Sequence, residues 1–336
     1  MKELCRASGG NCGGTSVDNA FKQIFAEIVG EPLLTEMQKE NPSAYLDIFR
    51  ELEAVKRTVY TDLEDTVTMS IPRFDLDKMC MKHHNKDFEA VVQSSPNHDK
   101  MIIVSDDSMI INTNLIIDMF KQASERIIEL MSDALKEMKG SNLKMIFLVG
   151  GFSGCKIIQD KIKSFFHNQR VIVPENAELT ILKGAVLFGH KPDYIVARIA
   201  RYTYGVNTTR EFNSDIHDLG RRVVINGKEK CDFIFDIYKK IGSVVKMGAN
   251  ITDNFKTVRP FQSEISFPIF RSTAECPQYT DVEDCTKLGT LRAHIQDPSY
   301  EIRDFRLTMI FGNTEFRVTV FDIKSGVECV TVLDLF

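Results

Sequence analysis

Residues 143–158 read LKMIFLVGGFSGCKII, and this stretch decides the fold class. The largely apolar run 143–149 is typical of a strand that is buried on both faces of a parallel sheet. Gly150 and Gly151 follow at once, and apolar residues at helical spacing begin after Cys155. A strand, a glycine turn and a helix in this order predict an α/β sheet domain.

Helical and strand patterns alternate on both sides of this stretch, up to about residue 190. Apolar residues that recur three and four positions apart predict a helix, and strict alternation predicts a half-buried strand. Strands are expected over residues 66–72 and 170–173. Helices are expected over residues 17–25, 42–59, 115–138 and 177–188. Gly140 is the expected stop of the longest helix, because glycine readily adopts the left-handed conformation that ends many helices.

Beyond about residue 190, nearly all of the pattern is that of short strands. Turn signals such as Asn226-Gly227 and Ser325-Gly326 separate them, and several strands at this spacing predict a β-sandwich. The expected strands cover residues 202–208, 222–225, 255–259, 264–270, 289–295, 305–311, 315–322 and 328–333. We therefore expect an α/β domain over residues 1–190, a linker over 191–201 and an all-β sandwich over 202–336.

Composition excludes several classes of function. The chain has 336 residues and a net charge of −5 without a basic run, which argues against a nucleic-acid surface. No apolar stretch reaches the roughly 18 residues of a membrane helix, and the first residues have no signal-peptide core. Eight cysteines without a Cys-x-x-Cys pair favour a reducing compartment. We therefore expect a cytoplasmic protein with neither nucleic-acid nor membrane partners.

The segment with Cys80, His83 and His84 resembles part of a metal site. Zinc requires four convergent ligands, and no second cluster of cysteine and histidine supplies the others. We expect a polar, solvated helix face at this segment and no metal.

Two glycine turns could approach a ligand closely. GGNCGG at residues 9–14 lies directly before a predicted helix, whose free N–H groups favour anions. It is not a Walker A loop, because no Gly-Lys-Ser/Thr follows. Gly150-Gly151 ends a predicted buried strand, where ligands bind in open α/β sheets. A plain turn at residues 9–14, and tight strand-to-helix packing at Gly150-Gly151, are the alternative explanations.

Glu53, Lys56 and Arg57 lie three and four residues apart and therefore share one helix face. One interpretation is a solvated ion pair within the helix. The other is a nucleoside clamp, in which Glu53 and Lys56 bond ribose hydroxyls and Arg57 stacks its planar guanidinium on the base. The spacing leaves both interpretations open.

Four segments resemble, in the same order, the later part of the ATPase domain of seventy-kilodalton heat-shock proteins. They are ASGGNCGGTSVDNAF, ELEAVKRTV, MIFLVGGFSGCKIIQDKI and PENAELTILKGAVLFG. The chain is more closely similar to the divergent twelfth subfamily, of which TILKGAVLFG and RYTYGV are the most specific marks. The resemblance extends from about residue 3 to the end. It implies the C-terminal part of an actin-like nucleotide-binding domain over residues 1–190, with a ribonuclease H-like sheet and with ATP or ADP as ligand.

By position, this resemblance assigns the nucleoside and phosphate contacts to Gly13, Gly14, Glu53, Lys56, Arg57, Gly150 and Gly151. Three positions depart from the family: Phe152 replaces a small hydroxyl residue, Gly154 an arginine and Tyr60 a serine. These departures retain the phosphate end of the pocket and weaken the selectivity for adenine.

The family's Asp-Gly-Thr phosphate hairpins and Mg²⁺-orienting carboxylates are not found in this sequence. Phosphoryl transfer depends on such groups, because positioning and charge neutralisation provide most of the catalysis. We therefore expect an N-terminally truncated relative that has no catalytic residues and does not hydrolyse ATP alone. Mg²⁺ is expected only where an upstream lobe is present.

The second half resembles the family's peptide-binding β-sandwich, notably in the ending FRLTMIFGNTEFRVTVFDIKSGVECVTV. By position, the residues that line the peptide groove are Val206, Phe255, Val258, Ile265 and Phe267. Ordinary core packing is the alternative for Phe255, Ile265 and Phe267. The resemblance implies a chaperone of the stress response, with extended or unfolded polypeptide and co-chaperones as partners. The rival is a non-catalytic interaction or scaffold module that holds partner proteins without nucleotide.

Overall fold

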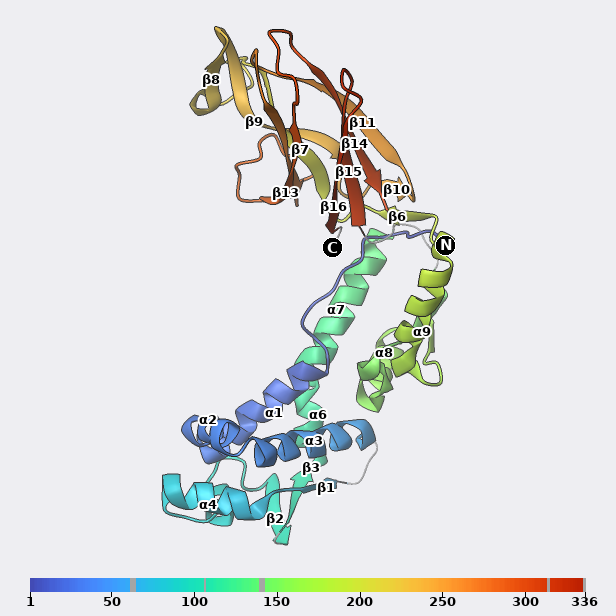
Figure 1. Ribbon diagram of the computed structural model, residues 1–336. Helices are drawn as coiled ribbons and strands as arrows, with labels where there is room; N and C mark the ends of the chain where they lie inside the picture. The colour runs from blue at the N-terminus through green and yellow to red at the C-terminus, as the bar shows by residue number, and fades with distance from the viewer. Residues whose placement is uncertain (61–64, 106, 139–142, 313–314, 335–336) are drawn as a thin grey trace. The chain divides into compact units, whose positions relative to one another are not determined.

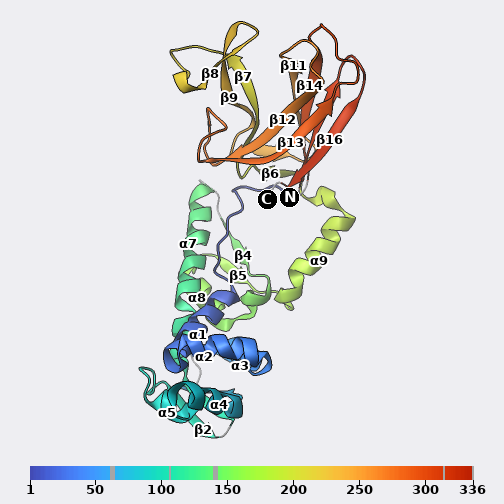
Figure 2. The same ribbon diagram turned by 60° about the vertical axis from the view of Figure 1, so that its left-hand side comes forward.

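The computed structural model describes residues 1–60, 65–105, 107–138, 143–312 and 315–334. The chain forms a mixed α and β structure with several sheets, divided into two compact units (Figures 1 and 2). We call Ser8–Leu187 the α/β unit. Met1–Ala7 and Phe188–Phe336 together form the second unit, which we call the β unit.

The helices α1 to α9 alternate with short strands, and α9 extends three residues past the α/β unit. Their bounds are α1 Gly14–Val29, α2 Glu31–Glu40, α3 Pro42–Thr58, α4 Arg73–His84, α5 Phe88–Gln93, α6 Thr113–Met119, α7 Lys121–Glu137, α8 Lys156–Phe165 and α9 Ala177–His190. The short 3₁₀ helix η1 covers Gly151–Gly154. In α1 the buried Phe21 and Phe25 lie one turn apart and their rings stack at 5.7 Å. This spacing buries one face of the helix, as the sequence predicted for residues 17–25.

Two small sheets complete the α/β unit. Strands β1 (Thr66–Ser70), β3 (Ser108–Asn112) and β2 (Met101–Ser105) form an antiparallel sheet in that order. In β3, Met109 and Ile111 are buried on one face. Strands β4 (Met145–Phe147) and β5 (Arg170–Ile172) form a parallel pair.

Burial of the run 143–149 differs from the prediction. β4 has three residues, of which Ile146 is buried while Met145 and Phe147 are 47% and 58% exposed. The prediction of a strand buried on both faces was therefore wrong. An apolar run shows that both faces can be buried, but only neighbouring elements decide whether they are.

The single long helix expected over residues 115–138 is two helices, α6 and α7, which meet at Phe120. Phe120 is fully buried, and its ring stacks on that of Phe152 with centroids 6.1 Å apart. The apolar spacing continues across the junction, so periodicity could not reveal it. Gly140, the expected stop, lies outside the described residues.

α9 is apolar and exposed. Ile181, Leu182, Val186 and Leu187 are each 60–67% exposed, whereas Ala177 is buried. The helix begins and ends close to the predicted range 177–188, but its burial does not follow from its composition. Exposed apolar area of this kind marks a contact surface or an aggregation liability.

The β unit contains two larger antiparallel sheets (Figure 2). One has the strand order β13–β12–β7–β9–β8 and the other β11–β14–β15–β16, and β6 pairs with β10. The bounds are β6 Ala197–Ile199, β7 Thr203–Glu211, β8 Arg222–Ile225, β9 Lys228–Lys239, β10 Val244–Lys246, β11 Asn250–Lys256, β12 Glu264–Ser272, β13 Cys285–His294, β14 Asp304–Phe311, β15 Glu315–Asp322 and β16 Glu328–Asp334. The 3₁₀ helices η2 and η3 cover Pro192–Tyr194 and Leu219–Arg221.

Alternate residues of these strands form one core. Leu307 and Met309 of β14 and Val318 of β15 are fully buried, and they cluster with Val206 of β7 and Ile269 of β12. The two sheets therefore contribute to a shared interior, as period-two alternation along these strands predicts. The strand expected over residues 255–259 lies earlier in the chain, because β11 begins at Asn250 and ends at Lys256.

The first residues lie with the β unit. Lys2 forms a parallel bridge to Ala197, and the Glu3 N–H donates to the carbonyl of Ala197 at 3.2 Å. The Glu3 carboxylate also accepts from the N–H of Ile199 at 2.8 Å. The sequence pattern instead predicts these first residues in the α/β domain of 1–190, and it predicts a linker over residues 191–201, which contain β6.

Candidate functional site

A groove opens where β7 and β12 separate. Their described pairing runs from Thr203↔Ser272 to Val206↔Ile269. The next residue of β12 is Pro268, which has no N–H to donate to a ladder. Past this point β7 pairs with β9 and β12 with β13, so each strand keeps its outer neighbour. The two strands therefore present their facing edges to the same space.

The groove has a volume of about 270 Å³. One wall comes from β7 and the other from the end of β11, the following loop and β12. The lining residues are Asn207, Thr208, Thr209, Phe255, Lys256, Val258, Gln262, Glu264, Ile265, Ser266, Phe267 and Pro268. We call the apolar Phe255, Ile265 and Phe267 the floor of the groove and the charged Lys256 and Glu264 its rim. Apolar side chains with a few polar groups are usual in a binding cleft.

The structure brings four of the five sequence-predicted groove residues together. Phe255, Val258, Ile265 and Phe267 line the groove, whereas Val206 is fully buried in the core beside it. The Phe255 and Phe267 rings meet edge to face, with centroids 5.1 Å apart. Ile265 and Phe267 also belong to the hydrophobic core, as the alternative of ordinary core packing expects.

Hydrogen bonds within the loop after β11 give this wall its shape. The Val258 N–H donates to Gln262 Oε1 at 3.1 Å, and Gln262 Nε2 donates to the carbonyl of Glu264 at 2.7 Å. The Asn226 side chain, from the turn between β8 and β9, donates to the Val258 carbonyl. Val258 itself remains 44% exposed, so its side chain is accessible to a ligand.

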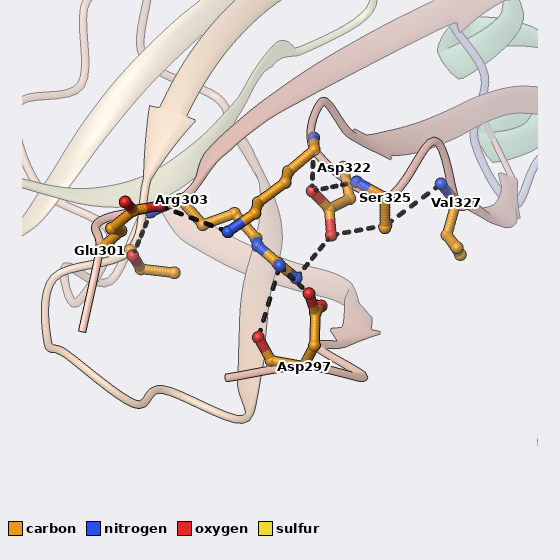
Figure 3. Close-up of polar contacts among 8 residues, drawn as sticks. Asp297, Glu301, Arg303, Asp322, Ser325 and Val327 are labelled. Atoms are coloured by element: carbon orange, nitrogen blue, oxygen red, sulfur yellow. Dashed lines mark hydrogen bonds and ion pairs between the residues drawn. The ribbon is translucent and has the colours of Figure 1, made fainter. Parts of the chain in front are cut away.

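A buried arginine, Arg303, is paired with two aspartates (Figure 3) and bonded to the loop of this wall. The Arg303 side chain is 4% exposed and lies between Asp322 at 3.1 Å and Asp297 at 2.6 Å. Its backbone exchanges two hydrogen bonds with Thr257, the residue between Lys256 and Val258 of the groove. Burying a guanidinium costs free energy unless it is paired, and here both carboxylates pair it.

Asp322 also holds a second segment. Asp322 accepts from the backbone N–H of Lys324 at 3.0 Å and from the Ser325 hydroxyl at 2.7 Å, which fixes the β15–β16 turn. The hydrogen bond from Arg303 holds the pKa of Asp297 below its ordinary value, against the smaller effect of burial. Arg303 therefore joins three loops of the β unit.

No sequence pattern predicts this cluster, because its members lie 6 to 46 residues apart. A partial signal was present in Asp322–Gly326, where an aspartate followed by serine and glycine is typical of a tight turn. Thr208, Thr209 and Gln262 were also missed as groove residues.

The predicted nucleotide contacts lie in the α/β unit, and three of their segments meet. A β-carbon on Gly14 would lie 3.8 Å from Lys56 Nζ and 3.6 Å from Phe152 Cδ2. Phe152 follows Gly151 in η1. The first turn of α1, the last turn of α3 and η1 are thus neighbours in space.

Lys56 is enclosed. It is 5% exposed, and its ammonium lies 2.5 Å from Asp18 and 2.5 Å from Glu53. Burial alone would lower the pKa of Lys56, but the bonds to Asp18 and Glu53 raise it above its ordinary value. Burial alone would raise the pKa of Glu53, but the bonds to Lys56 and Arg57 lower it below its ordinary value.

The other predicted contacts are more open. Arg57 contacts Glu53 at 3.1 Å while its side chain stays 74% exposed. A β-carbon on Gly151 or Gly13 would meet no atom within 4 Å, and Gly150 has a φ of 91° that suits glycine. The Gly150 N–H donates to the carbonyl of Ala177, which ties η1 to the start of α9.

Among the described residues, no three histidine, cysteine or acidic side chains are placed to hold a metal ion. His83 and His84 are exposed, as expected, and contact Glu36 and the Val29 carbonyl. Cys80, however, is fully buried, so the expected solvated face does not include it. In the described part of the chain, no helix combines the length and apolar character needed to cross a membrane.

Comparison with known proteins places the chain in context. No family model matches it. It is 29% identical over 331 residues to heat shock 70 kDa protein 12A of Homo sapiens and 28% identical over 331 residues to the Mus musculus protein of that name. It is also 28% identical over 337 residues to heat shock 70 kDa protein 12B of Homo sapiens.

Each alignment covers 97% of this chain and 49% of the relative. The chain therefore spans about half the length of the curated relatives that it matches. Similarity across nearly all of its residues confirms the resemblance drawn from its segments. The chain is a divergent relative of the twelfth subfamily of seventy-kilodalton heat-shock proteins.

Proposed function

We propose that the β unit is a β-sandwich that binds extended polypeptide in the groove between β7 and β12. The single observation that supports this most is the divergence of the two strands past Val206 and Ile269. An extended peptide is held by main-chain hydrogen bonds, with pockets for alternate side chains. The separated strand edges offer the main-chain hydrogen bonds, and the apolar floor offers a pocket for a side chain.

The floor favours an aliphatic or aromatic side chain of the peptide. Phe255 and Phe267 meet edge to face, and Ile265 adds an aliphatic surface beside them. The rim carries Lys256, which is 3.1 Å from Asp304, and Glu264, which is 3.7 Å from Arg292. Because both rim charges are already paired, we expect specificity to depend more on the apolar side chain than on peptide charge.

The proposed client is an unfolded or extended chain, as the resemblance to heat-shock proteins suggests. A fluorescent seven-residue peptide with a central leucine tests this by anisotropy. A denatured, carboxymethylated protein should compete for the site, and the same protein in its native state should not. Equal competition by both would contradict a site for extended chains.

A second proposed activity is weak binding of ATP or ADP in the α/β unit, without hydrolysis by this chain alone. The meeting of Gly14, Lys56 and Phe152 supports it, because three segments that the resemblance assigns to one nucleotide are neighbours. When bound, the nucleotide would present its phosphates to the turns at Gly13-Gly14 and Gly150-Gly151, and its nucleoside to Glu53 and Arg57. An anion that engaged Lys56 would have to replace Asp18 or Glu53, and this competition makes the binding weak.

Thermal unfolding in the presence of ADP separates this activity from the rival, a scaffold that works without nucleotide. A ligand that binds only the native state raises the melting temperature by mass action. We expect a rise at millimolar ADP that is lost in Arg57→Ala and retained in Arg50→Ala, which removes a similarly exposed arginine of α3. No rise in the parent chain, together with peptide binding, would favour the scaffold.

A further inference from the structure

Two aromatic side chains are exposed beside the groove. Phe261 and Tyr300 are 64% and 76% exposed, and their rings meet edge to face with centroids 6.3 Å apart. Phe261 lies in the loop between β11 and β12, and Tyr300 lies in the loop between β13 and β14. Aromatic side chains provide much of the binding energy of protein interfaces. A pair of rings held together in solvent is therefore a candidate contact for a ligand.

The two loops are hydrogen-bonded to each other at three points. The buried arginine of the groove wall joins them at one end. The Phe261 N–H donates to the Ser299 carbonyl at 2.8 Å, and the Ile295 N–H donates to the Ser263 carbonyl at 2.8 Å. Because Ser299 directly precedes Tyr300, the bond from Phe261 fixes the backbones of the two aromatic residues relative to each other. The fold therefore places both rings.

The backbone of Phe261 is strained. Its φ is 55°, in the left-handed region that glycine and asparagine enter readily and that a bulky residue rarely adopts. Such a conformation persists only where the surrounding structure imposes it, and it is often found where ligands are held. Here the bond to Ser299 and the side chain of Gln262, which bonds to Val258 and Glu264, impose it. The turn itself does not require phenylalanine, which indicates a role for the ring.

The aromatic pair adjoins the groove through its own loop. Val258 and Gln262, before and after Phe261 in this loop, both line the groove. The groove volume of about 270 Å³ is smaller than the roughly 300–1,000 Å³ of pockets that enclose a small-molecule ligand. An extended peptide of seven residues spans roughly 23 Å. Most of a bound peptide would therefore lie outside the groove, against the surface next to it.

We propose that Phe261 and Tyr300 form a second subsite for the peptide that the groove binds, one that takes an aromatic side chain. This inference rests on the proposed peptide-binding function. An edge-to-face pair leaves part of each ring open, and a third ring adds to it in the same edge-to-face or offset geometry. An aliphatic side chain makes no such oriented contact. The preferred ligand is therefore an extended chain with one apolar residue in the groove and an aromatic residue a few positions away.

A positional scan of the peptide tests the subsite by anisotropy with the full chain. The host is the seven-residue fluorescent peptide with a central leucine and serine elsewhere, and phenylalanine replaces one serine at a time. We expect phenylalanine at one or two positions to tighten binding about two- to tenfold, the range of one aromatic pair, and to have no effect at the others. Equal affinity for every peptide of the scan would overturn the subsite, while the groove itself would stand.

Phe261→Asn removes the ring, and asparagine tolerates the left-handed backbone, so the variant should unfold at no lower temperature than the parent chain. The ratio of the affinities for the best phenylalanine peptide and for the host peptide should fall to about one. Tyr300→Ser should lower the same ratio. Phe233→Asn is the matched control, because Phe233 is 42% exposed with a φ of 59° and lies in β9 outside the groove lining. This control should keep the ratio of the parent chain.

Three outcomes would contradict the proposal, and they are distinguishable. An unchanged affinity ratio in Phe261→Asn would overturn the subsite alone. Failure of the parent chain to bind any peptide of the scan would overturn both the subsite and the proposed function. Sedimentation of the parent chain as a dimer and of Phe261→Asn as a monomer would show that a second copy covers the rings, which would also overturn the subsite.

Discussion

Thr257 and Arg303 exchange two hydrogen bonds, each 2.9 Å long. The Thr257 N–H donates to the Arg303 carbonyl, and the Arg303 N–H donates to the Thr257 hydroxyl. Thr257 is buried between two residues that line the groove, Lys256 and Val258. Arg303 is buried and does not line the groove itself, but through this exchange it sets the position of the groove wall.

Arg303→Met should destabilise the β unit by about 3 kcal/mol, because Asp322 would remain buried without its cation. Urea unfolding measures this loss. Arg306→Met, which removes an exposed arginine of β14, should change stability by less than about 0.5 kcal/mol. Adding Asp322→Leu to Arg303→Met should recover part of the loss, since the uncompensated charge is then gone. Equal stability of the single and double variants would contradict this explanation.

The Lys56 cluster predicts how the stability of the α/β unit depends on pH. The pKa of Lys56 is raised in the folded chain, so its contribution is full below the ordinary value of 10.5 and is lost as pH rises through the folded value. The pKa of Glu53 is lowered, so its contribution is present above the ordinary value of 4.5 and is lost as pH falls through the folded value. Stability should therefore decline at both extremes.

Lys56→Met should flatten both declines and cost about 1–3 kcal/mol at pH 7, a range between exposed and buried ion pairs. Unfolding followed by circular dichroism from pH 3 to pH 11 measures the profile. Lys22→Met provides a control for general charge effects, because Lys22 lies on α1 outside the cluster. A variant profile as steep as that of the parent chain would exclude the cluster as the source.

The exposed apolar surface of α9 predicts binding of hydrophobic dyes. We expect 8-anilinonaphthalene-1-sulfonate fluorescence to rise with the native chain and to fall by about half or more in Leu182→Glu/Val186→Glu, because charges interrupt the patch. The melting temperature should change little, as both side chains are more than 60% exposed. Unchanged fluorescence in the double variant would place the dye elsewhere.

Sequence patterns predicted those elements whose burial depends on their own periodicity. α1, α3, β14 and β15 begin or end within a few residues of their expected positions. β9 was missed, because its first residues, Lys228-Glu229-Lys230, carry charges that obscure the apolar stretch after them. The exposure of Phe147 and of α9 could not be predicted, since it depends on which neighbours cover them and not on composition.

The candidate groove was predictable only in part. Phe255, Ile265 and Phe267 were assigned by resemblance, and alternation along a strand could not have separated groove from core. The support from Arg303 is a relationship between loops that are distant in sequence. Likewise, the spacing of Glu53, Lys56 and Arg57 predicted a shared face but gave no sign that Asp18 would enclose the lysine.

Peptide binding by a Val258→Asp variant tests the central claim most directly. Val258 lines the groove and is 44% exposed, so a carboxylate there would be desolvated by a bound peptide while the free chain stays folded. Anisotropy with the leucine-centred peptide should show at least about tenfold weaker binding, corresponding to about 1.4 kcal/mol. Val224→Asp, the same change at an exposed residue of β8 outside the groove lining, should bind as the parent chain does. Equal affinity in the Val258 and Val224 variants would contradict the assignment of this groove as the peptide site.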